Sequence, residues 1–195
     1  MNLEQTPALV TAALALLGYA SVPGLERLPG GDSGELLAEA CVGGVAHPPG
    51  YPLLLGLLRL AFLTNSGRFP FVLIANTLNA VLAAVAAGLI SQCVHLLTEK
   101  QHPAAAITAG LLFAFSSVVW EHARGIEVRS GGALTALTTV LTTAACVFAL
   151  NNLLVGCLHV LVVWHFRHPS GVTASLGGFV CGLGAANQHT IGEES

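Results

Sequence analysis

The sequence predicts an all-α, polytopic helical membrane protein. Of its 195 residues, 54% are hydrophobic and only 9% are charged, and the mean hydropathy is +0.75. Soluble domains carry about 25% charged residues, so the few charges here cannot cover the surface of a globular particle. The high hydrophobicity also excludes a disordered chain. Seven Lys and Arg residues with a net charge of -3 exclude a nucleic-acid-binding surface.

Long apolar runs separated by clustered charges supply the second observation. A helix needs about 20 predominantly apolar residues to cross the hydrocarbon core, and the runs lack the alternation of barrel strands. One run is short and another is too long for a single crossing, with a break expected at the Asn151–Asn152 pair. We expect about five to seven membrane helices in a single membrane domain over residues 1–195. The candidate runs are 7–22, 51–63, 71–97, 104–120, 134–166 and 172–186.

The run 7–22 is interpreted as a retained first span rather than a signal peptide, because no basic residue precedes it. Small residues are dense at 83–88, and Gly178 and Gly182 stand four residues apart. This spacing indicates tight packing between helices rather than a specific dimer face. Arg59 and Arg68 flank the connection after the second run, so the positive-inside rule places that connection in the cytosol and residues 25–50 on the opposite side.

Acidic residues and a rigid turn make 25–50 the segment expected to carry chemistry. Asp32 or Ser33 can begin a short amphipathic helix as its N-cap, and Glu35 and Glu39 then share one face. The sequence His-Pro-Pro-Gly-Tyr-Pro at 47–52 predicts a stiff turn, because proline lacks an amide donor and restricts the residue before it. Acids beside a membrane can be desolvated and their pKa retuned. The alternative interpretation is a solvated amphipathic connector.

Other motifs indicate neither a metal nor a cofactor. The five cysteines form no CxxC pair, and four lie in apolar runs, where cysteine acts as a small hydrophobe. His165 and His168 are interpreted as an interfacial helix end. Gly-Asp-Ser-Gly at 31–34 resembles a serine-protease segment, but helical membrane spans lack the scaffold that such a triad requires. Residues 182–187 nearly imitate a dinucleotide fingerprint, without its last glycine and without a preceding strand.

Two motifs resemble the signature of the transmembrane protein 260 family. They are Gly-Asp-Ser-Gly-Glu-Leu at 31–36 and Gly-Val-Ala-His-Pro-Pro-Gly-Tyr-Pro-Leu at 44–53. The family is one of polytopic O-mannosyltransferases of the endoplasmic reticulum with the GT-C fold. The resemblance implies that the chain is the N-terminal part of a GT-C-like glycosyltransferase, with the loop 25–50 in the lumen. Further matching segments are 68–70 with Asn76 and Asn79, 147–153, and 187–191.

The resemblance also implies a reaction and its residues. Mannose would pass from dolichyl phosphate mannose, a lipid-linked donor rather than a cofactor, to Ser or Thr of luminal receptor domains of the plexin type, with inversion. GT-C enzymes carry their catalytic acid in the first luminal loop, which here is Asp32. A hydroxyl is a poor nucleophile, so a carboxylate should take its proton during attack. For substrate binding, His47, or an arginine from a later loop, is expected to stabilise the leaving phosphate. Glu35 is expected to orient the sugar or the acceptor, or only to cap and solvate the loop helix.

Glu127 is a further substrate-binding candidate. Counting spans places its loop on the cytosolic side, opposite Asp32, unless one apolar run is re-entrant. Two segments beyond it depart from the family pattern: residues 128–146 read as an insert, and 192–195 form an atypical polar tail. Val-Arg-Ser and Gly-Glu-Glu can both be encoded with GTGAGG, a splice-donor sequence, so alternative splicing or translated intron is our hypothesis for both.

Family members are several times longer, so this chain is expected to lack much of the donor and acceptor site. A non-catalytic membrane isoform or scaffold is the alternative function. A transporter is disfavoured because the long apolar runs carry no intramembrane charges.

Overall fold

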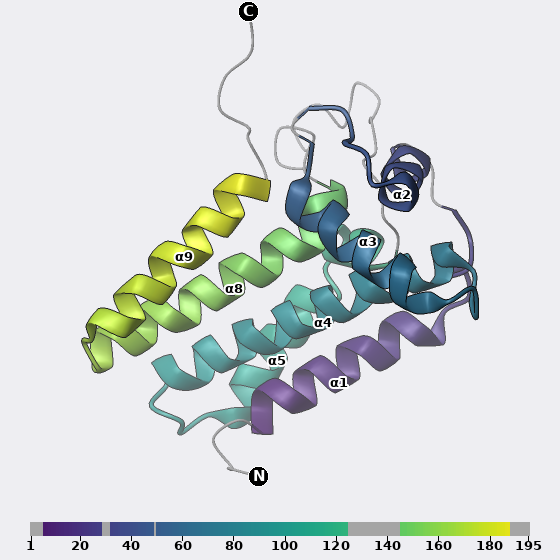
Figure 1. Cartoon of the computed structure of the whole chain (residues 1–195). Coiled ribbons are helices and arrows are strands. Elements are labelled where there is room, and N and C mark those ends of the chain that lie inside the picture. Colours follow the sequence, from purple (N-terminus) through teal and green to yellow (C-terminus); the bar gives the residue numbers. More distant parts are fainter. Residues whose placement is uncertain (1–5, 29–31, 49, 125–144, 188–195) are drawn as a thin grey trace, which may run out of the picture.

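The structure is a computed structural model that describes residues 6–28, 32–48, 50–124 and 145–187. It confirms the all-α prediction, since the described residues form eight helices and no strand. Figure 1 shows five of them, α1, α4, α5, α8 and α9, running roughly along one direction, with α2 and α3 beside one end. The helices are α1 Thr6–Ser21, α2 Ser33–Val42, α3 Pro52–Asn65, α4 Phe71–Leu97, α5 Pro103–Ala114, α6 Ser117–Ala123, α8 Ala145–Arg167 and α9 Gly171–Asn187.

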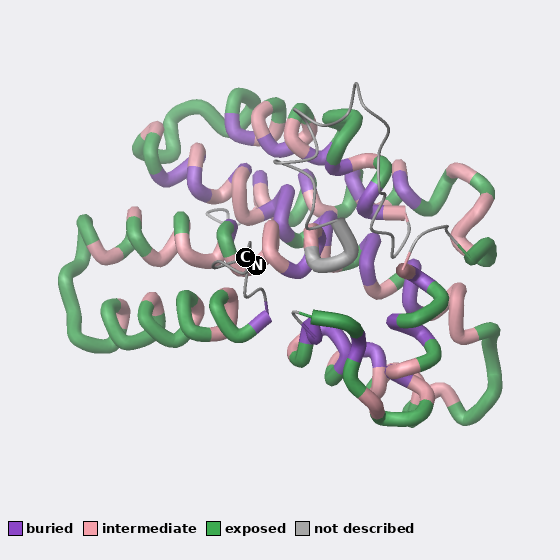
Figure 2. Tube along the Cα trace, turned by 90° about the horizontal axis from the view of Figure 1, so that it is seen from above, coloured by how far each residue is buried: buried purple, intermediate pink, exposed green. Residues whose placement is uncertain are grey.

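α4 is the central helix, and small residues let its neighbours approach it closely. It packs against α1, α5 and α8, and buried positions gather in the interior of the bundle in Figure 2. A Cβ added at Gly88 would lie 2.8 Å from the carbonyl oxygen of Ala8, and one added at Gly110 would lie 2.8 Å from that of Ala87. The predicted tight packing through 83–88 is therefore confirmed. Gly178 and Gly182 in α9 contact no other helix in this way.

Fewer long apolar helices are found than the predicted five to seven crossings. Among the described residues, 71–97 and 148–167 are long and apolar enough to span a membrane. A third span results if α5 and α6 count as one, although they meet at a bend of 67°. The run 104–120 is thus broken near 115–116 rather than continuous. α1 and α3 are shorter apolar helices, so the predicted number of crossings is not confirmed.

The expected break at the Asn151–Asn152 pair is wrong, because α8 continues through both residues. Asn151 instead bonds a side chain of α9: its Oδ1 accepts a hydrogen bond from Nδ2 of Asn187 at 3.3 Å. An amide side chain that finds a partner on a neighbouring helix does not need to open its own helix. Residues 134–144, which the predicted run also included, lie outside the described residues.

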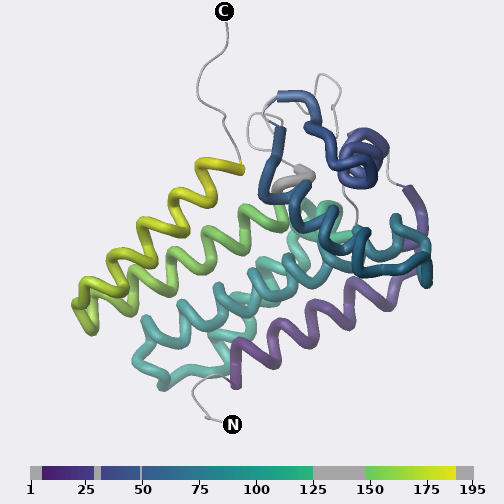
Figure 3. The backbone as a smooth tube through the Cα atoms, in the orientation of Figure 1, coloured from purple at the N-terminus to yellow at the C-terminus, as the bar shows by residue number. Residues whose placement is uncertain are grey.

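The second apolar run forms the 14-residue α3, which pairs with α2, as the tube in Figure 3 makes visible. The Arg59 guanidinium donates from Nη1 to the carbonyl oxygen of Ala40 at 3.1 Å and to that of Cys41. The last carbonyls of a helix lack intrahelical partners, and a cationic side chain satisfies them. Arg59 therefore lies beside the loop 25–50 and cannot mark the opposite side of a membrane. The luminal placement of that loop stays a prediction.

Replacing Gly88 by valine should destabilise the bundle. The new side chain must displace the backbone of α1, and overpacking of this kind costs about 1–3 kcal/mol. We expect a lower thermal unfolding midpoint in detergent, measured by tryptophan fluorescence. Gly178→Val is the matched control, because a Cβ there meets nothing within 4 Å. Equal midpoints for the two variants would contradict the packing described here.

Candidate functional site

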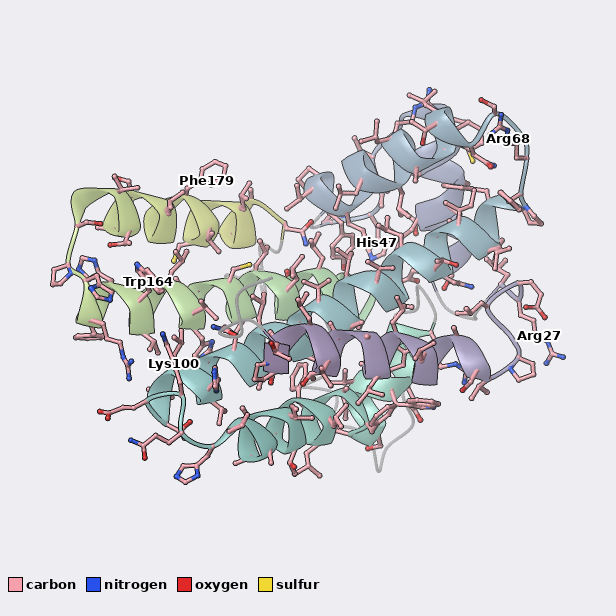
Figure 4. All side chains as sticks on the ribbon, turned by 90° about the horizontal axis from the view of Figure 1, so that it is seen from below. Arg27, His47, Arg68, Lys100, Trp164 and Phe179 are labelled. Atoms are coloured by element: carbon pink, nitrogen blue, oxygen red, sulfur yellow. The ribbon has the colours of Figure 1, made fainter. Side chains whose placement is uncertain are left out.

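The candidate site is formed by the first turn of α2 and the turn that leads into α3. Asp32 occupies the N-cap position of α2, and Gly43, with φ +74°, ends the helix. The amides of Gly43 and Gly44 both donate to the carbonyl oxygen of Glu39, at 2.8 and 2.9 Å. This reversal brings His47 back to the start of α2. Figure 4 marks His47 in the part of the molecule where α2, α3 and α4 meet.

His47 lies between two carboxylates. Oε1 of Glu35 accepts a hydrogen bond from the backbone N–H of His47 at 2.7 Å, and Oε2 lies 2.9 Å from Nδ1 of its ring. Oδ2 of Asp32 lies 3.6 Å from Nε2 on the other edge of the ring. Each of the three side chains is 36–40% exposed, so a substrate can reach them. The structure thus brings together Asp32, Glu35 and His47, whereas Glu127 lies outside the described residues.

The hydrogen bonds from His47 hold the pKa of the Glu35 carboxyl below its usual range, first the one from the backbone N–H and then the one from the ring. Because an ionised carboxylate only accepts hydrogen bonds, Nδ1 of the ring carries the proton. Nε2 is then the nitrogen that faces Asp32. Asp32, one of the two predicted candidates, occupies the N-cap position of α2, but its carboxylate makes no cap hydrogen bond. The predicted satisfaction of free amides by this side chain is therefore not found, and its Oδ2 lies toward His47 instead.

The chain makes a turn after His47. The amide of Gly50 donates to the carbonyl oxygen of His47 at 2.8 Å, and Gly50 has φ +85°. Tyr51 also has a positive φ, +44°, which costs a non-glycine residue about 1 kcal/mol or more. Its buried ring meets the His47 ring edge-on, with centroids 5.9 Å apart. Pro52 then begins α3 with the fixed φ that suits the first helical position.

Two asparagines that the sequence analysis did not assign to the site form hydrogen bonds to the backbone segments next to it. Oδ1 of the fully buried Asn187, at the end of α9, accepts from the amide of Leu54 in the first turn of α3 at 3.1 Å. Nδ2 of Asn76 in α4 donates to the carbonyl oxygens of Leu25 and Arg27, at 2.7 and 3.0 Å. A polar side chain within or at the end of an apolar run is the signal that points to such a role.

No cluster of three or more His, Cys, Asp or Glu side chains suited to a metal ion occurs in the described part of the chain. The described cysteines Cys41, Cys93, Cys157 and Cys181 are free thiols.

The Glu35–His47 pair should respond to acid. Since the pKa of Glu35 is lowered in the folded state, the pair stabilises the turn at neutral pH, and this stabilisation is lost as pH falls through the folded-state pKa, below the usual value of about 4.3. The protection factor of the His47 amide, which is its exchange rate corrected for the intrinsic pH dependence, should be constant from pH 5 to 7 (roughly the range in which the carboxylate is fully ionised) and fall below it. In Glu35→Gln the acid-dependent step should vanish. A step of unchanged midpoint in that variant would refute the assignment.

Asn187→Leu should loosen the start of α3. Loss of one buried hydrogen bond costs about 1 kcal/mol, so exchange of the Leu54 amide should rise about fivefold. Asn187→Asp keeps the accepting oxygen, and the Asn151 amide can turn to donate to it, so this variant should exchange like the unmodified chain. Exchange rates that are the same in the leucine and aspartate variants would argue against the role of Asn187.

The sequence of this chain is similar to a known protein family and to two curated proteins. The family description "Protein O-mannosyl-transferase TMEM260 N-terminal domain" matches residues 32–192. The chain is 38% identical over 190 residues to protein O-mannosyl-transferase TMEM260 of Mus musculus, covering 93% of this chain and 23% of that protein. It is 28% identical over 177 residues to protein O-mannosyl-transferase tmem260 of Dictyostelium discoideum, covering 83% of this chain and 19% of that protein.

The chain thus spans about a quarter or less of the length of these curated relatives. No solved structure matches it. The matched residues include the whole candidate site, from Asp32 to the turn before α3, together with α8 and α9. The chain belongs to the TMEM260 N-terminal domain family.

Proposed function

We propose that this chain contributes the acceptor-activating part of a protein O-mannosyltransferase. The observation that carries the proposal is the grouping of Asp32, Glu35 and His47 in one accessible site beside an apolar helical bundle. The names of the curated relatives support the class of reaction. Under this proposal the donor is dolichyl phosphate mannose and the acceptors are Ser or Thr of luminal receptor domains, of the plexin type, at the endoplasmic reticulum membrane.

Asp32 is the proposed base. Its carboxylate takes the proton of the acceptor hydroxyl as the oxygen attacks the anomeric carbon of mannose. The new bond joins that oxygen to the anomeric carbon, and the bond from this carbon to the phosphate oxygen breaks on the opposite face. The electron pair leaves with dolichyl phosphate, so the configuration inverts. Oδ2 of the carboxylate lies 3.6 Å from Nε2 of His47, and the Asp32 side chain is 36% exposed, so a hydroxyl can reach it.

His47 is the proposed cation of the site. When Nε2 binds a proton, the ring carries a positive charge flanked by Asp32 and Glu35, and it can stabilise negative charge developing on the departing phosphate. Both oxygens of Glu35 are engaged by His47. We therefore assign Glu35 as a positioning residue that fixes the imidazole, rather than as a group that holds the sugar or the acceptor.

Further parts of the site are proposed to come from the region that the relatives possess beyond this match. Rate depends on holding donor and acceptor in register, and a chain matching 23% of the mouse protein would supply one portion of those contacts. We propose that the same further region completes the GT-C fold of the family. The helices described here would then be the N-terminal membrane helices of that fold.

A scaffold role is the second candidate, favoured by the outer face of α9. This helix buries only Asn187 among its residues. Val172 is 70% exposed and Phe179 is 63% exposed, so the face is open to another membrane helix.

Mannose transfer to a plexin-type repeat, in cells lacking the endogenous enzyme, tests the proposal. In the full-length form, Asp32→Asn should lower transfer about a hundredfold or more, the range of a lost general base. Glu26→Gln, an exposed acid in the same connection, should leave transfer unchanged at equal expression. Transfer that survives Asp32→Asn would remove the catalytic assignment. The 195-residue chain, tested alongside, is expected to be inactive if the scaffold role holds for it.

A further inference from the structure

A groove of about 370 Å³ lies between the end of α2 and the first half of α3, and the proposed reaction does not use it. Sites for small ligands usually have volumes of roughly 300–1,000 Å³. The walls are mostly apolar, and they include one carboxylate and one guanidinium. The lining contains Glu39, Gly43, Val45, Leu55, Gly56 and Arg59.

The Arg59 guanidinium is fixed on two sides and open on a third. Its Nη1 donates to the carbonyl oxygens of Ala40 and Cys41 at the end of α2, and its central carbon lies 5.7 Å from the centre of the Phe62 ring. None of the described residues accepts a hydrogen bond from Nε or Nη2. Gly43, with φ +74°, has no side chain to cover this edge, and a Cβ there would lie 3.8 Å from Nε. Two parallel N–H groups of arginine match two phosphate oxygens.

Glu39 brings the opposite charge to the same groove but does not pair with Arg59. Its side chain lies over Gly44, since a Cβ added there would meet Oε2. In the described part of the chain the carboxylate has no ion pair within 4.0 Å and accepts no hydrogen bond. Opposite charges attract strongly where water is partly excluded, so a ligand that carries both a cation and an anion can satisfy the two side chains together.

A primary ammonium suits Glu39 better than a quaternary one. An ammonium with N–H groups has three hydrogen-bond donors, whereas a trimethylammonium has none. Proteins recognise quaternary ammonium groups with cages of aromatic side chains, and no aromatic residue is among the described residues that line this groove. The carboxylate also disfavours a ligand that carries only negative charge.

Exposed apolar side chains around the groove suit the acyl chains of a membrane lipid. Val45 in the wall is 78% exposed, and Val42 in the last turn of α2 is 75% exposed. Leu60 and Leu63, which share one face of the apolar helix α3, are each 60% exposed. The boundary between headgroups and acyl chains accommodates a helix with such a face.

We infer that this groove holds a zwitterionic phospholipid with a primary amine, of the phosphatidylethanolamine class. Its phosphodiester lies on Nε and Nη2 of Arg59, its ammonium lies on Glu39, and its acyl chains pass over Val45. This lipid is a component of the bilayer and takes no part in mannose transfer. It joins the end of α2 to the start of α3, next to the turn that carries His47.

Native mass spectrometry of the full chain, released from nanodiscs with equal amounts of phosphatidylethanolamine and phosphatidylcholine, tests the inference. The unmodified chain should retain phosphatidylethanolamine in preference to phosphatidylcholine. Glu39→Gln removes the negative charge, and the preference should fall about tenfold, the effect of losing one charge-assisted hydrogen bond. Glu26→Gln is the matched control, because Glu26 is an exposed acid outside the groove; its preference should be unchanged.

Gly56→Leu should block the groove without removing a contact of the fold. Gly56 lines the groove, and a Cβ added there meets nothing within 4 Å. Leucine also favours a helix more than glycine does, and tryptophan fluorescence checks that the variant is folded. Lipid retention should fall about tenfold or more. Gly184→Leu, at an open position of α9 outside the groove, should retain the lipid like the unmodified chain.

Equal retention of the two phospholipids, an unchanged preference in Glu39→Gln, or unchanged retention in Gly56→Leu would each overturn the inference. Retention of phosphatidylglycerol as strong as that of phosphatidylethanolamine would also overturn it, because that lipid lacks the ammonium. Soluble glycerophosphoethanolamine lacks the acyl chains and should not displace the lipid. Displacement by a plexin-type repeat would assign the groove to a polypeptide instead. Asp32→Asn should retain the lipid normally, so failure of lipid binding and failure of mannose transfer are separate results.

Discussion

Side chains that satisfy backbone groups at helix ends are the interaction on which the rest of this structure depends. Only 9% of the residues are charged, so few charged side chains can form hydrogen bonds to the free backbone groups at helix ends. Helix ends packed among apolar side chains also have little water to satisfy those groups. Arg59 serves the last carbonyls of α2, Asn187 serves the first turn of α3, and Asn76 serves the connection after α1. These contacts locate the one polar site that we describe.

The residues of the site come from one short stretch of sequence, but a hydrogen bond from a distant part of the chain fixes the helix that follows it. Asp32 and His47 are 15 positions apart in the printed sequence, and the glycine-ended α2 folds one back onto the other. The start of α3 is secured by α9, which lies 133 residues along the chain from its partner. The proposed reaction depends on the distance between a base and an anomeric carbon, and it would need such rigidity. Under that proposal, buried amides in the apolar bundle matter for chemistry on its surface.

Close helix packing supplies the frame to which these contacts are attached. Glycines at positions 88 and 110 remove the side chains that would separate α4 from α1 and α5, so the bundle gains van der Waals contact without a hydrophobic driving force between helices. The bend between α5 and α6 interrupts what the composition alone presents as one apolar run. Composition reports how apolar a segment is, and it does not report where a helix changes direction.

The sequence by itself determined the helical class, the tight packing of 83–88, a helix start at Asp32 or Ser33 and a turn after His47, because each follows from local composition, small-residue spacing or proline geometry. It also singled out Asp32, Glu35 and His47. Only the tertiary structure decided that Glu35 holds His47, that Arg59 belongs to the end of α2, and that Asn151 bonds Asn187 instead of breaking α8. The physical reason is that a hydrogen-bonding side chain takes whichever partner the folded chain brings within about 3 Å, and sequence separation does not reveal that partner.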